Sequence, residues 1–189
     1  DDRVPGDVLT VAYTTAQFAD KNVGTSKPVS VSGISISGTE VANYSLVNTT
    51  ATTTADITVL TVTITAATDT KVYDGTTSSA KAPTIAPELA AGDTGTFSQT
   101  FDNRNVGPRN LTPAGTVNDG NEGKNYELKF VTATGSITAR AITVTATADS
   151  KVYDGTTVSS KVPTITSGSL GTGDTASFTQ AFASRNAGS

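Results

Sequence analysis

Apolar and polar residues alternate along several short stretches of the chain. Val62–Ala66 reads Val-Thr-Ile-Thr-Ala, and both Ile142–Ala148 and Tyr126–Phe130 follow the same rule. A period of two places every second side chain on one face, so each stretch predicts a β-strand with one buried face. The pattern predicts two further strands, at Val29–Val31 and Ile34–Ile36.

Turn residues separate these stretches. Asp-Gly pairs stand at 74–75 and 154–155, and they predict tight turns because Gly accepts a positive φ and Asp bonds to neighbouring backbone. The polar segment 118–123 predicts another turn. Only Ala86–Gly92, with Pro87 near its start, suggests a short helical turn. The chain is therefore predicted to be all-β.

An internal repeat is the strongest signal in the sequence. The segment Lys-Val-Tyr-Asp-Gly-Thr-Thr at Lys71–Thr77 recurs unchanged at Lys151–Thr157. Agreement at a fixed period indicates a tandem array. After one inserted residue the agreement continues: Gly92-Asp93-Thr94 matches Gly173-Asp174-Thr175, Gln99 matches Gln180, Phe101 matches Phe182, Arg104-Asn105 matches Arg185-Asn186, and Gly107 matches Gly188.

A third copy is visible near the start of the chain. Phe18–Gly24 matches Phe101–Gly107, and the Asn-Tyr-x-Leu sequence beginning at Asn43 matches the one beginning at Asn125. We therefore predict three segments: the C-terminal part of one repeat at 1–60, a complete repeat of about 80 residues at 61–140, and the N-terminal part of another at 141–189. Both ends fall inside a repeat, so a longer parent chain is expected.

The predicted elements also indicate an architecture. Each complete repeat has room for five to seven short strands, which is typical of a small β-sandwich or a β-grasp-like unit. The junctions at 58–61 and 138–141 contain no Gly/Pro/Ser-rich linker. Because strand runs almost directly into strand there, we expect the repeats to form an elongated rod rather than loosely joined beads.

Composition narrows the functional classes. Thr is the most frequent residue, with 37 copies, and it favours extended backbone. The chain has no His, Cys, Met or Trp and a formal net charge of −4. The absence of a Lys/Arg cluster argues against nucleic-acid binding, and no apolar run approaches the ~20 residues that span a membrane. Without His or Cys, nucleophile–base triads are unavailable, so we expect no enzyme.

The motifs resemble those of a known family. The Lys-Val-Tyr-Asp-Gly-Thr-Thr, Phe-x-x-(Lys/Arg)-Asn-(Val/Ala)-Gly and Asn-Tyr-x-Leu segments follow one another along the repeat. In this order they resemble the YDG/MBG-type repeats of large bacterial surface adhesins of the filamentous-haemagglutinin kind. The resemblance covers essentially the whole chain. It implies an extended stalk of a secreted or cell-surface protein, with no catalytic residues to carry over.

The repeated Tyr-Asp-Gly element is the first candidate site. It comprises Tyr73, Asp74 and Gly75, and again Tyr153, Asp154 and Gly155. Its aspartates could bind Ca²⁺ or touch a glycan. We favour a structural role instead, in which the tyrosines pack into the core and Asp-Gly makes the turn, because an identical motif in successive copies suits a folding device.

A weaker candidate is a calcium site in the turn after residue 117. Four residues there carry oxygen ligands of the kind that Ca²⁺ prefers, and they are Asn118, Asp119, Asn121 and Glu122. The spacing is not that of an EF-hand, and Lys124 opposes a cation, so we favour an ordinary solvated turn and expect no cofactor.

Two further groups of residues recur in the repeats. Asp93 and Asp174 each follow a glycine and are expected to cap or turn the chain. Lys71 and Lys151 also recur, as do Asn105 and Asn186, and they would permit an intramolecular Lys–Asn isopeptide bond. The sequence offers no evident buried carboxylate to catalyse it.

The functional prediction is a stalk segment of an adhesin in cell adhesion or biofilm formation, whose immediate partners are neighbouring repeats of the same chain. Two alternatives stay open. The repeats themselves could bind extracellular polysaccharide or a host surface, or the chain could belong to a homopolymeric extracellular fibre completed by strand exchange.

Overall fold

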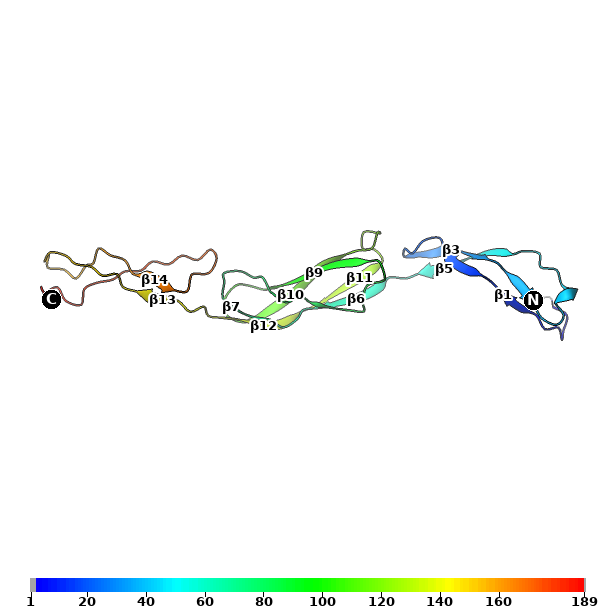
Figure 1. The fold of residues 1–189 in the computed structure, drawn as a ribbon, viewed down its shortest axis with the longest axis horizontal. Coiled ribbons are helices and arrows are strands. Elements are labelled where there is room, and N and C mark those ends of the chain that lie inside the picture. The colour runs from blue at the N-terminus through cyan, green and yellow to red at the C-terminus, as the bar shows by residue number, and fades with distance from the viewer. Residues whose placement is uncertain (1–2, 189) are drawn as a thin grey trace. The chain divides into compact units, whose positions relative to one another are not determined.

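The computed structural model describes residues 3–188 and consists almost entirely of β-strands (Figure 1). The described residues hold fourteen strands and one 3-10 helical turn, η1, at Val41–Asn43. The prediction of an all-β chain is confirmed. No helix in this part of the chain is long and apolar enough to cross a membrane.

The chain forms two compact units. Of the described residues, the first unit comprises 3–62, 89–95 and 117–128, and the second comprises 63–88, 96–116 and 129–188. Four strands contribute residues to both units, namely β6 (Leu60–Thr65), β9 (Thr94–Phe101), β10 (Gly107–Asn118) and β11 (Tyr126–Val131).

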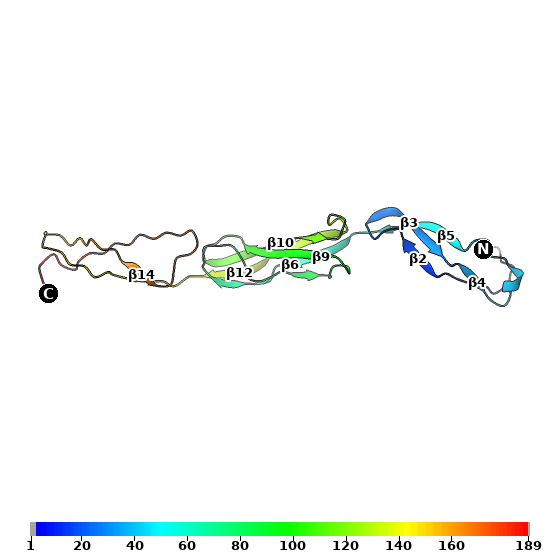
Figure 2. The ribbon, with the colours of Figure 1, turned by 45° about the horizontal axis from the view of Figure 1, so that its top comes forward.

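An antiparallel sheet with the order β2-β3-β5 lies in the first unit (Figures 1 and 2). Val29 and Val31 in the central strand are half-buried and the intervening Ser30 is exposed, so the predicted alternation holds. A separate antiparallel pair joins β1 to β4. The bounds are β1 at Thr10–Ala12, β2 at Thr15–Phe18, β3 at Gly24–Ser32, β4 at Ser35–Ser37 and β5 at Thr50–Ile57.

Two sheets contribute strands to the second unit. One sheet has the order β7-β12-β10-β9 and the other has the order β11-β6-β8. The shorter strands are β7 (Thr70–Val72), β8 (Thr84–Ala86) and β12 (Ala133–Thr138). The buried cluster consists of Ala66, Phe101, Leu111 and Ile137, with Tyr73 and Ala133 packed against it. The strand residues of this cluster come from β9, β10 and β12 of the larger sheet, and Ala66 directly follows β6 of the smaller one.

Strand β12 occupies a central place in the larger sheet. It runs parallel to β7, with Ile137 opposite Lys71, and antiparallel to β10, with Ile137 opposite Gly107. Ile137 is 1% exposed. Gly135 of the same strand admits no side chain, because a Cβ there would lie 2.5 Å from the carbonyl oxygen of Asp69. Close packing on both sides of β12 therefore restricts which residues the strand can carry.

Residues 141–188 contain two paired strands, β13 (Thr143–Thr145) and β14 (Thr164–Ser167). The strand predicted at Ile142–Ala148 is thus shorter than expected. The reason is its partner: β14 begins at Thr164, opposite Thr145, so residues 146–148 have no strand beside them among the described residues.

The predicted helical turn at Ala86–Gly92 is wrong. Ala86 is the last residue of β8 and pairs with Thr63 of β6, which requires extended backbone. Gly92 has a φ of +89°, which places the chain in a turn. The only helical residues in the described part of the chain are those of η1, for which the alternation pattern gave no signal.

Candidate functional site

The ammonium group of Lys71 closes the first Asp-Gly turn from inside. Its Nζ donates to Asp74 Oδ1 at 2.9 Å, to the carbonyl oxygen of Thr76 at 2.8 Å and to Thr76 Oγ1 at 3.0 Å. It also donates to the carbonyl oxygen of Ser78 at 2.9 Å. Four acceptors share the three N–H groups of a side chain that is only 15% exposed. The lysine is therefore an integral part of the turn.

The second turn repeats this arrangement. Lys151 Nζ donates at 2.9 Å to Asp154 Oδ1, to both oxygens of Thr156, and to the carbonyl oxygen of Val158. Lys, Asp and Thr all belong to the repeated heptapeptide, so the motif carries its own turn. These contacts also engage each lysine amine with oxygen atoms, and they lend no support to an isopeptide bond at Asn105 or Asn186.

The carboxylate of Asp74 holds the other side of the turn. The Lys71 ammonium group and then the Thr76 backbone N–H lower the pKa of Asp74 from 3.8 to about 2. The pKa of Asp154 is lowered to about 2 by its own lysine and threonine partners. Gly75 has a φ of +84°, a conformation that side chains disfavour. The aspartate is thus committed to internal bonds rather than to a ligand.

The lysine also connects each turn to an aromatic ring. Lys71 Nζ lies 5.5 Å from the centroid of the Phe101 ring, and Lys151 Nζ lies 5.4 Å from that of Phe182. Both distances are within the range of a cation–π interaction. Phe101 belongs to the buried core, so the contact ties the turn to the core of its repeat.

The two motif tyrosines lie in different environments. Tyr73 packs against the core, and its backbone N–H donates to the carbonyl oxygen of Thr138, the last residue of β12, at 2.8 Å. Tyr153 is 64% exposed, contrary to the expectation that it packs into a core. The cause is the neighbouring strand, because no counterpart of β12 lies beside Tyr153 among the described residues.

A network of buried polar side chains joins the segments before and after the turn. Asp69, which is 7% exposed, accepts hydrogen bonds from Ser79 Oγ at 2.6 Å and from the Ala80 N–H at 3.2 Å. Gln99 bonds both the N–H and the carbonyl oxygen of Ala67, at 2.7 and 2.8 Å. The repeat at 141–188 contains the same network, formed by Asp149, Ser159 and Ser160 and by Gln180 with Thr147.

The predicted calcium loop is organised around Asp119. Its Oδ1 accepts the N–H groups of Asn121 and Gly123 at 2.7 and 2.8 Å, and Oδ2 accepts that of Asn125 at 3.0 Å. Burial by itself would raise the pKa of Asp119, but these N–H groups together hold it below its usual value. The side chain serves as the centre of a turn.

The other calcium candidates do not gather around Asp119 as ligands. Asn118 ends β10, and the carboxylate of Glu122 pairs with the ammonium group of Lys124 at 2.5 Å. Asn121 donates through its side-chain amide to Asn125 Oδ1 at 3.0 Å. Within residues 3–188 no group of three or more His, Cys, Asp or Glu side chains could hold a metal ion.

A Gly-Asp turn occurs three times at matching places. The N–H groups of Asp7, Asp93 and Asp174 each donate, at 3.0 Å, to the carbonyl oxygen three residues earlier. The preceding residues are Gly6, Gly92 and Gly173, with φ of +103°, +89° and +79°. The expectation that Asp93 and Asp174 lie in turns therefore matches the geometry.

Each of these carboxylates also accepts a tyrosine hydroxyl at 2.7 Å. Tyr44 donates to Asp7, and Tyr126 donates to Asp93, so the Asn-Tyr-x-Leu motif supplies the donor in both cases. At Asp174 the donor is Tyr73, the tyrosine of the Tyr-Asp-Gly motif in the preceding repeat.

A cation from the preceding repeat completes two of these turns. Lys21 Nζ lies 2.5 Å from Asp93 Oδ1, and Arg104 Nη2 lies 2.9 Å from Asp174 Oδ1. Lys21 and Arg104 occupy the same position in the Phe-x-x-(Lys/Arg)-Asn-(Val/Ala)-Gly motif. Lys21 and then Tyr126 hold the pKa of Asp93 below its usual value. Successive repeats are thus joined by the same pair of motif positions.

A second bond strengthens each of these junctions. Asn125 Oδ1 accepts the N–H of Val23 at 2.9 Å, and Arg104 Nη1 donates to the carbonyl oxygen of Thr172 at 3.0 Å. The sequence repeat makes Lys21 equivalent to Arg104 and Asp93 equivalent to Asp174, but it does not predict that each cation contacts an aspartate. The available signal was the recurrence of a cation in one motif and of an aspartate in another.

The chain matches one known family. The family model described as "YDG domain" matches residues 1–55 and again residues 56–135. No curated protein and no solved structure matches the chain.

Proposed function

Because the chain belongs to the YDG domain family, we propose that it is a stalk segment of an exported bacterial surface adhesin and has no catalytic activity. Its immediate partners are the repeats before and after each copy. The ligand-binding activity of such a protein would reside in another part of the parent chain, which the stalk holds away from the cell surface.

The observation that carries the proposal is the recurring junction. Lys21 with Asp93, and Arg104 with Asp174, place a cation of one repeat against the Gly-Asp turn of the next. A stalk needs each repeat fixed to its neighbour, because its stability and stiffness come from units and their interfaces together. A chain of independent binding modules has no such need.

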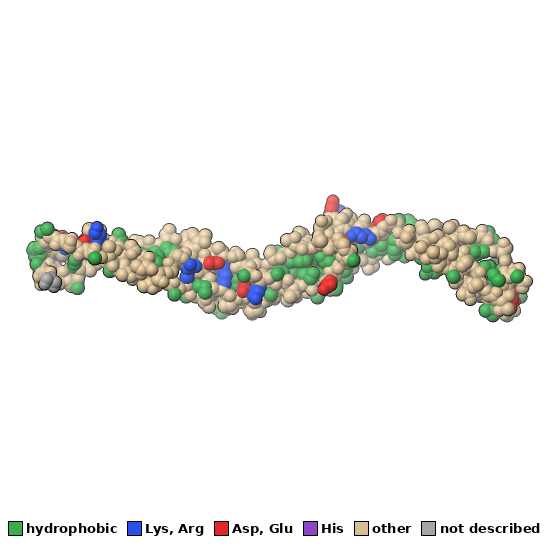
Figure 3. All heavy atoms as spheres, viewed as in Figure 1, with side chains coloured by type: hydrophobic (Ala, Val, Ile, Leu, Met, Phe, Trp, Pro, Cys, Tyr) green, Lys and Arg blue, Asp and Glu red, His purple; other side chains and the backbone are tan. Residues whose placement is uncertain are grey.

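The distribution of polar groups also favours a structural role. No buried side-chain nitrogen or oxygen atom among the described residues lacks a hydrogen-bond partner. On the face drawn in Figure 3, Lys and Arg side chains lie in small groups beside Asp and Glu side chains. Such mixed groups form no basic surface for nucleic acid. The repeated polar residues are used within the fold, and the chain contains neither His nor Cys for nucleophilic catalysis.

A spacer exchange in the parent protein tests the stalk function. Replacing these repeats by unrelated β-repeats of equal length should preserve adhesion, whereas deleting them should reduce it at equal surface abundance. Loss of adhesion in the exchanged protein would instead assign binding to the repeats themselves, which is the glycan-binding alternative.

The location is tested separately. Brief protease treatment of intact cells should release fragments of these repeats. Release only after cell lysis would contradict the surface location.

A further inference from the structure

Two segments of the complete repeat run side by side in the same direction. The first segment, residues 60–73, contains β6 and β7, and the last segment, residues 125–138, contains β11 and β12. Strand β6 neighbours β11 in the smaller sheet, and β7 pairs with β12 in parallel in the larger one. The chain thus enters the repeat through the first segment and leaves it through the last.

Backbone hydrogen bonds show that β6 and β11 are also parallel. The N–H of Leu60 donates to the carbonyl oxygen of Asn125 at 3.0 Å, and the N–H of Ala66 donates to that of Val131 at 2.9 Å. A step of six residues along the first segment therefore matches a step of six residues along the last, as in a parallel pair.

Strand β7 depends on β12 for its place in the sheet. It lies at the edge, with β12 on one side and no second neighbour among the described strands. The N–H of Ser136 donates to the carbonyl oxygen of Asp69 at 3.0 Å, and the N–H of Tyr73 donates to that of Thr138 at 2.8 Å. Strand β12 is in addition paired with β10. Separation of the two segments therefore requires that β7 break its bonds to β12.

Tension along the chain acts on these two strands from opposite ends. A pull on the preceding repeat acts at the N-terminal end of β7, and a pull on the following repeat acts at the C-terminal end of β12. Because both strands point the same way, the two forces run along the strands in opposite directions and load the bonds between them in shear. Bonds loaded in shear share the force, whereas bonds loaded from one end break one after another.

Close packing protects this region from water. The side chain of Ile137 in β12 is 1% exposed. Gln99, which is 3% exposed, bonds both backbone groups of Ala67, the residue that lies between β6 and β7. Where water cannot reach, a breaking backbone bond finds no replacement partner, so its rupture costs more free energy.

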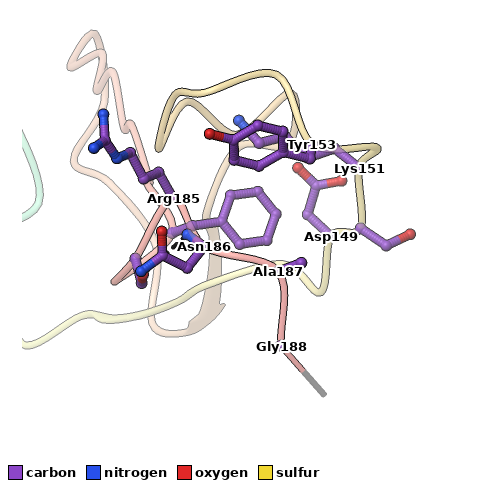
Figure 4. Close-up of a pocket in the computed structure, with 10 residues that line it drawn as sticks. Asp149, Lys151, Tyr153, Arg185, Asn186, Ala187 and Gly188 are labelled. Carbon is purple, nitrogen blue, oxygen red and sulfur yellow. Dashed lines mark hydrogen bonds between the residues drawn. The ribbon is translucent and has the colours of Figure 1, made fainter.

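We propose that the parallel β7–β12 pair is a mechanical clamp that keeps the repeat folded under tension. The inference rests on the proposed stalk function, because a stalk transmits tension between a bound surface and the cell. The clamp is a property of the repeat sequence, since its motif residues recur in the next copy. The counterparts there are Asp149, Lys151 and Tyr153, which lie along one side of a pocket (Figure 4).

Single-molecule pulling on the full chain tests the clamp. The chain has no native Cys, so pairs of introduced cysteines define the points of attachment. Thr68→Cys with Ala139→Cys loads β7 and β12 in shear, whereas Val72→Cys with Ala139→Cys separates the same strands from one end. All three positions are exposed, so the attachments should leave the fold intact.

We expect the mean rupture force to be several-fold higher for the shear attachment, because forced unfolding is governed by the rate of unfolding along the pulled direction. The two attachments release nearly the same length of chain, so the direction of loading is the main difference between them. Equal rupture forces in the two directions would overturn the proposal.

A side-chain variant provides a second test in the shear attachment. The hydroxyl groups of Thr70 and Ser136 lie 3.0 Å apart across the β7–β12 pair. Thr70→Val removes one of them and should lower the rupture force. Thr134→Val is the matched control, because Thr134 is exposed on β12 and lies opposite Asn110 of β10. If Thr70→Val lowers the force no more than the control does, β7–β12 pairing does not set the resistance.

The result is separable from that of the spacer exchange. Adhesion that survives the exchange, combined with equal rupture forces in the two directions, would overturn the clamp and leave the stalk function standing. Adhesion that is lost on exchange, combined with a high force in shear, would overturn the stalk function and leave the mechanical property of the pair.

Discussion

Lys71 and Asp74 form an ion pair of 2.9 Å across three residues, and Lys151 and Asp154 form one of the same length in the next repeat. The glycine of the turn directly follows the aspartate of each pair. Lys71 also donates to two backbone carbonyl oxygens of the turn, those of Thr76 and Ser78. The turn is thus held by a side chain from its own motif.

Replacing Lys71 by Met should destabilise the repeat by about 1–3 kcal/mol, because half-buried acceptors would lose their donor. The free energy of unfolding in urea measures the effect, and faster hydrogen exchange at residues 74–78 localises it. Lys124→Met is the matched control, since Lys124 and its partner Glu122 have side chains that are 68% and 80% exposed. Equal stability of the two variants would contradict the role of Lys71.

Stability should fall in acid over a defined range. The folded-state pKa values of Asp74 and Asp154 are lowered from 3.8 to about 2. Their contribution is therefore complete above about pH 4 and is lost as the pH falls toward 2. In the double variant Asp74→Asn, Asp154→Asn, the free energy of unfolding should decline less steeply between pH 5 and pH 2. The reason is that two groups whose pKa differs between the folded and unfolded states have been removed.

Glu88→Gln serves as the control for this experiment, because Glu88 lies exposed after β8. A decline as steep in the double aspartate variant as in the original chain would show that other carboxylates govern the acid transition.

The junction should loosen when its cation is removed. Arg104→Ser eliminates the ion pair with Asp174. In this pair the arginine side chain is 43% exposed and the aspartate side chain is 24% exposed. Spin labels at Thr132→Cys and Ser177→Cys, in a chain without native Cys, should then report a broader distance distribution. High salt should broaden the distribution in the original chain and change the variant little, because salt screens exposed charges.

Arg109→Ser is the control at this junction. Arg109, in β10, donates to the carbonyl oxygens of Asn105 and Val106 in the preceding loop, at 2.6 and 2.9 Å. A distribution that broadens equally in both variants would assign the effect to the loop rather than to the Arg104–Asp174 pair.

Calcium should leave the unfolding temperature unchanged. Both carboxylate oxygens of Asp119 accept backbone N–H groups, so an ion would have to displace three hydrogen bonds. Asp119→Asn should lower the unfolding temperature with or without calcium, since its amide would oppose an N–H donor. A rise in the original chain with millimolar Ca²⁺, absent from the variant, would establish the site after all.

Local pattern was sufficient for much of this protein. The alternation in Val62–Ala66 and Tyr126–Phe130 predicted strands, and the structure has them as β6 and β11. A strand with one buried face needs apolar residues at every second position, so its own sequence indicates it. The Asp-Gly turns followed from the backbone freedom of glycine at 75 and 155. The family followed from the recurring motifs.

Pairing between distant residues was decided only by the tertiary structure. Lys21 meets Asp93 and Arg104 meets Asp174, whereas repetition in a sequence establishes which residues are equivalent and not which are adjacent. Tyr73 and Tyr153 stand in identical heptapeptides, yet one packs against a core and the other is 64% exposed. Tyr73 is covered because its backbone N–H bonds to Thr138 in β12, a strand some sixty residues further along, and burial depends on what covers a side chain and not on the motif that carries it.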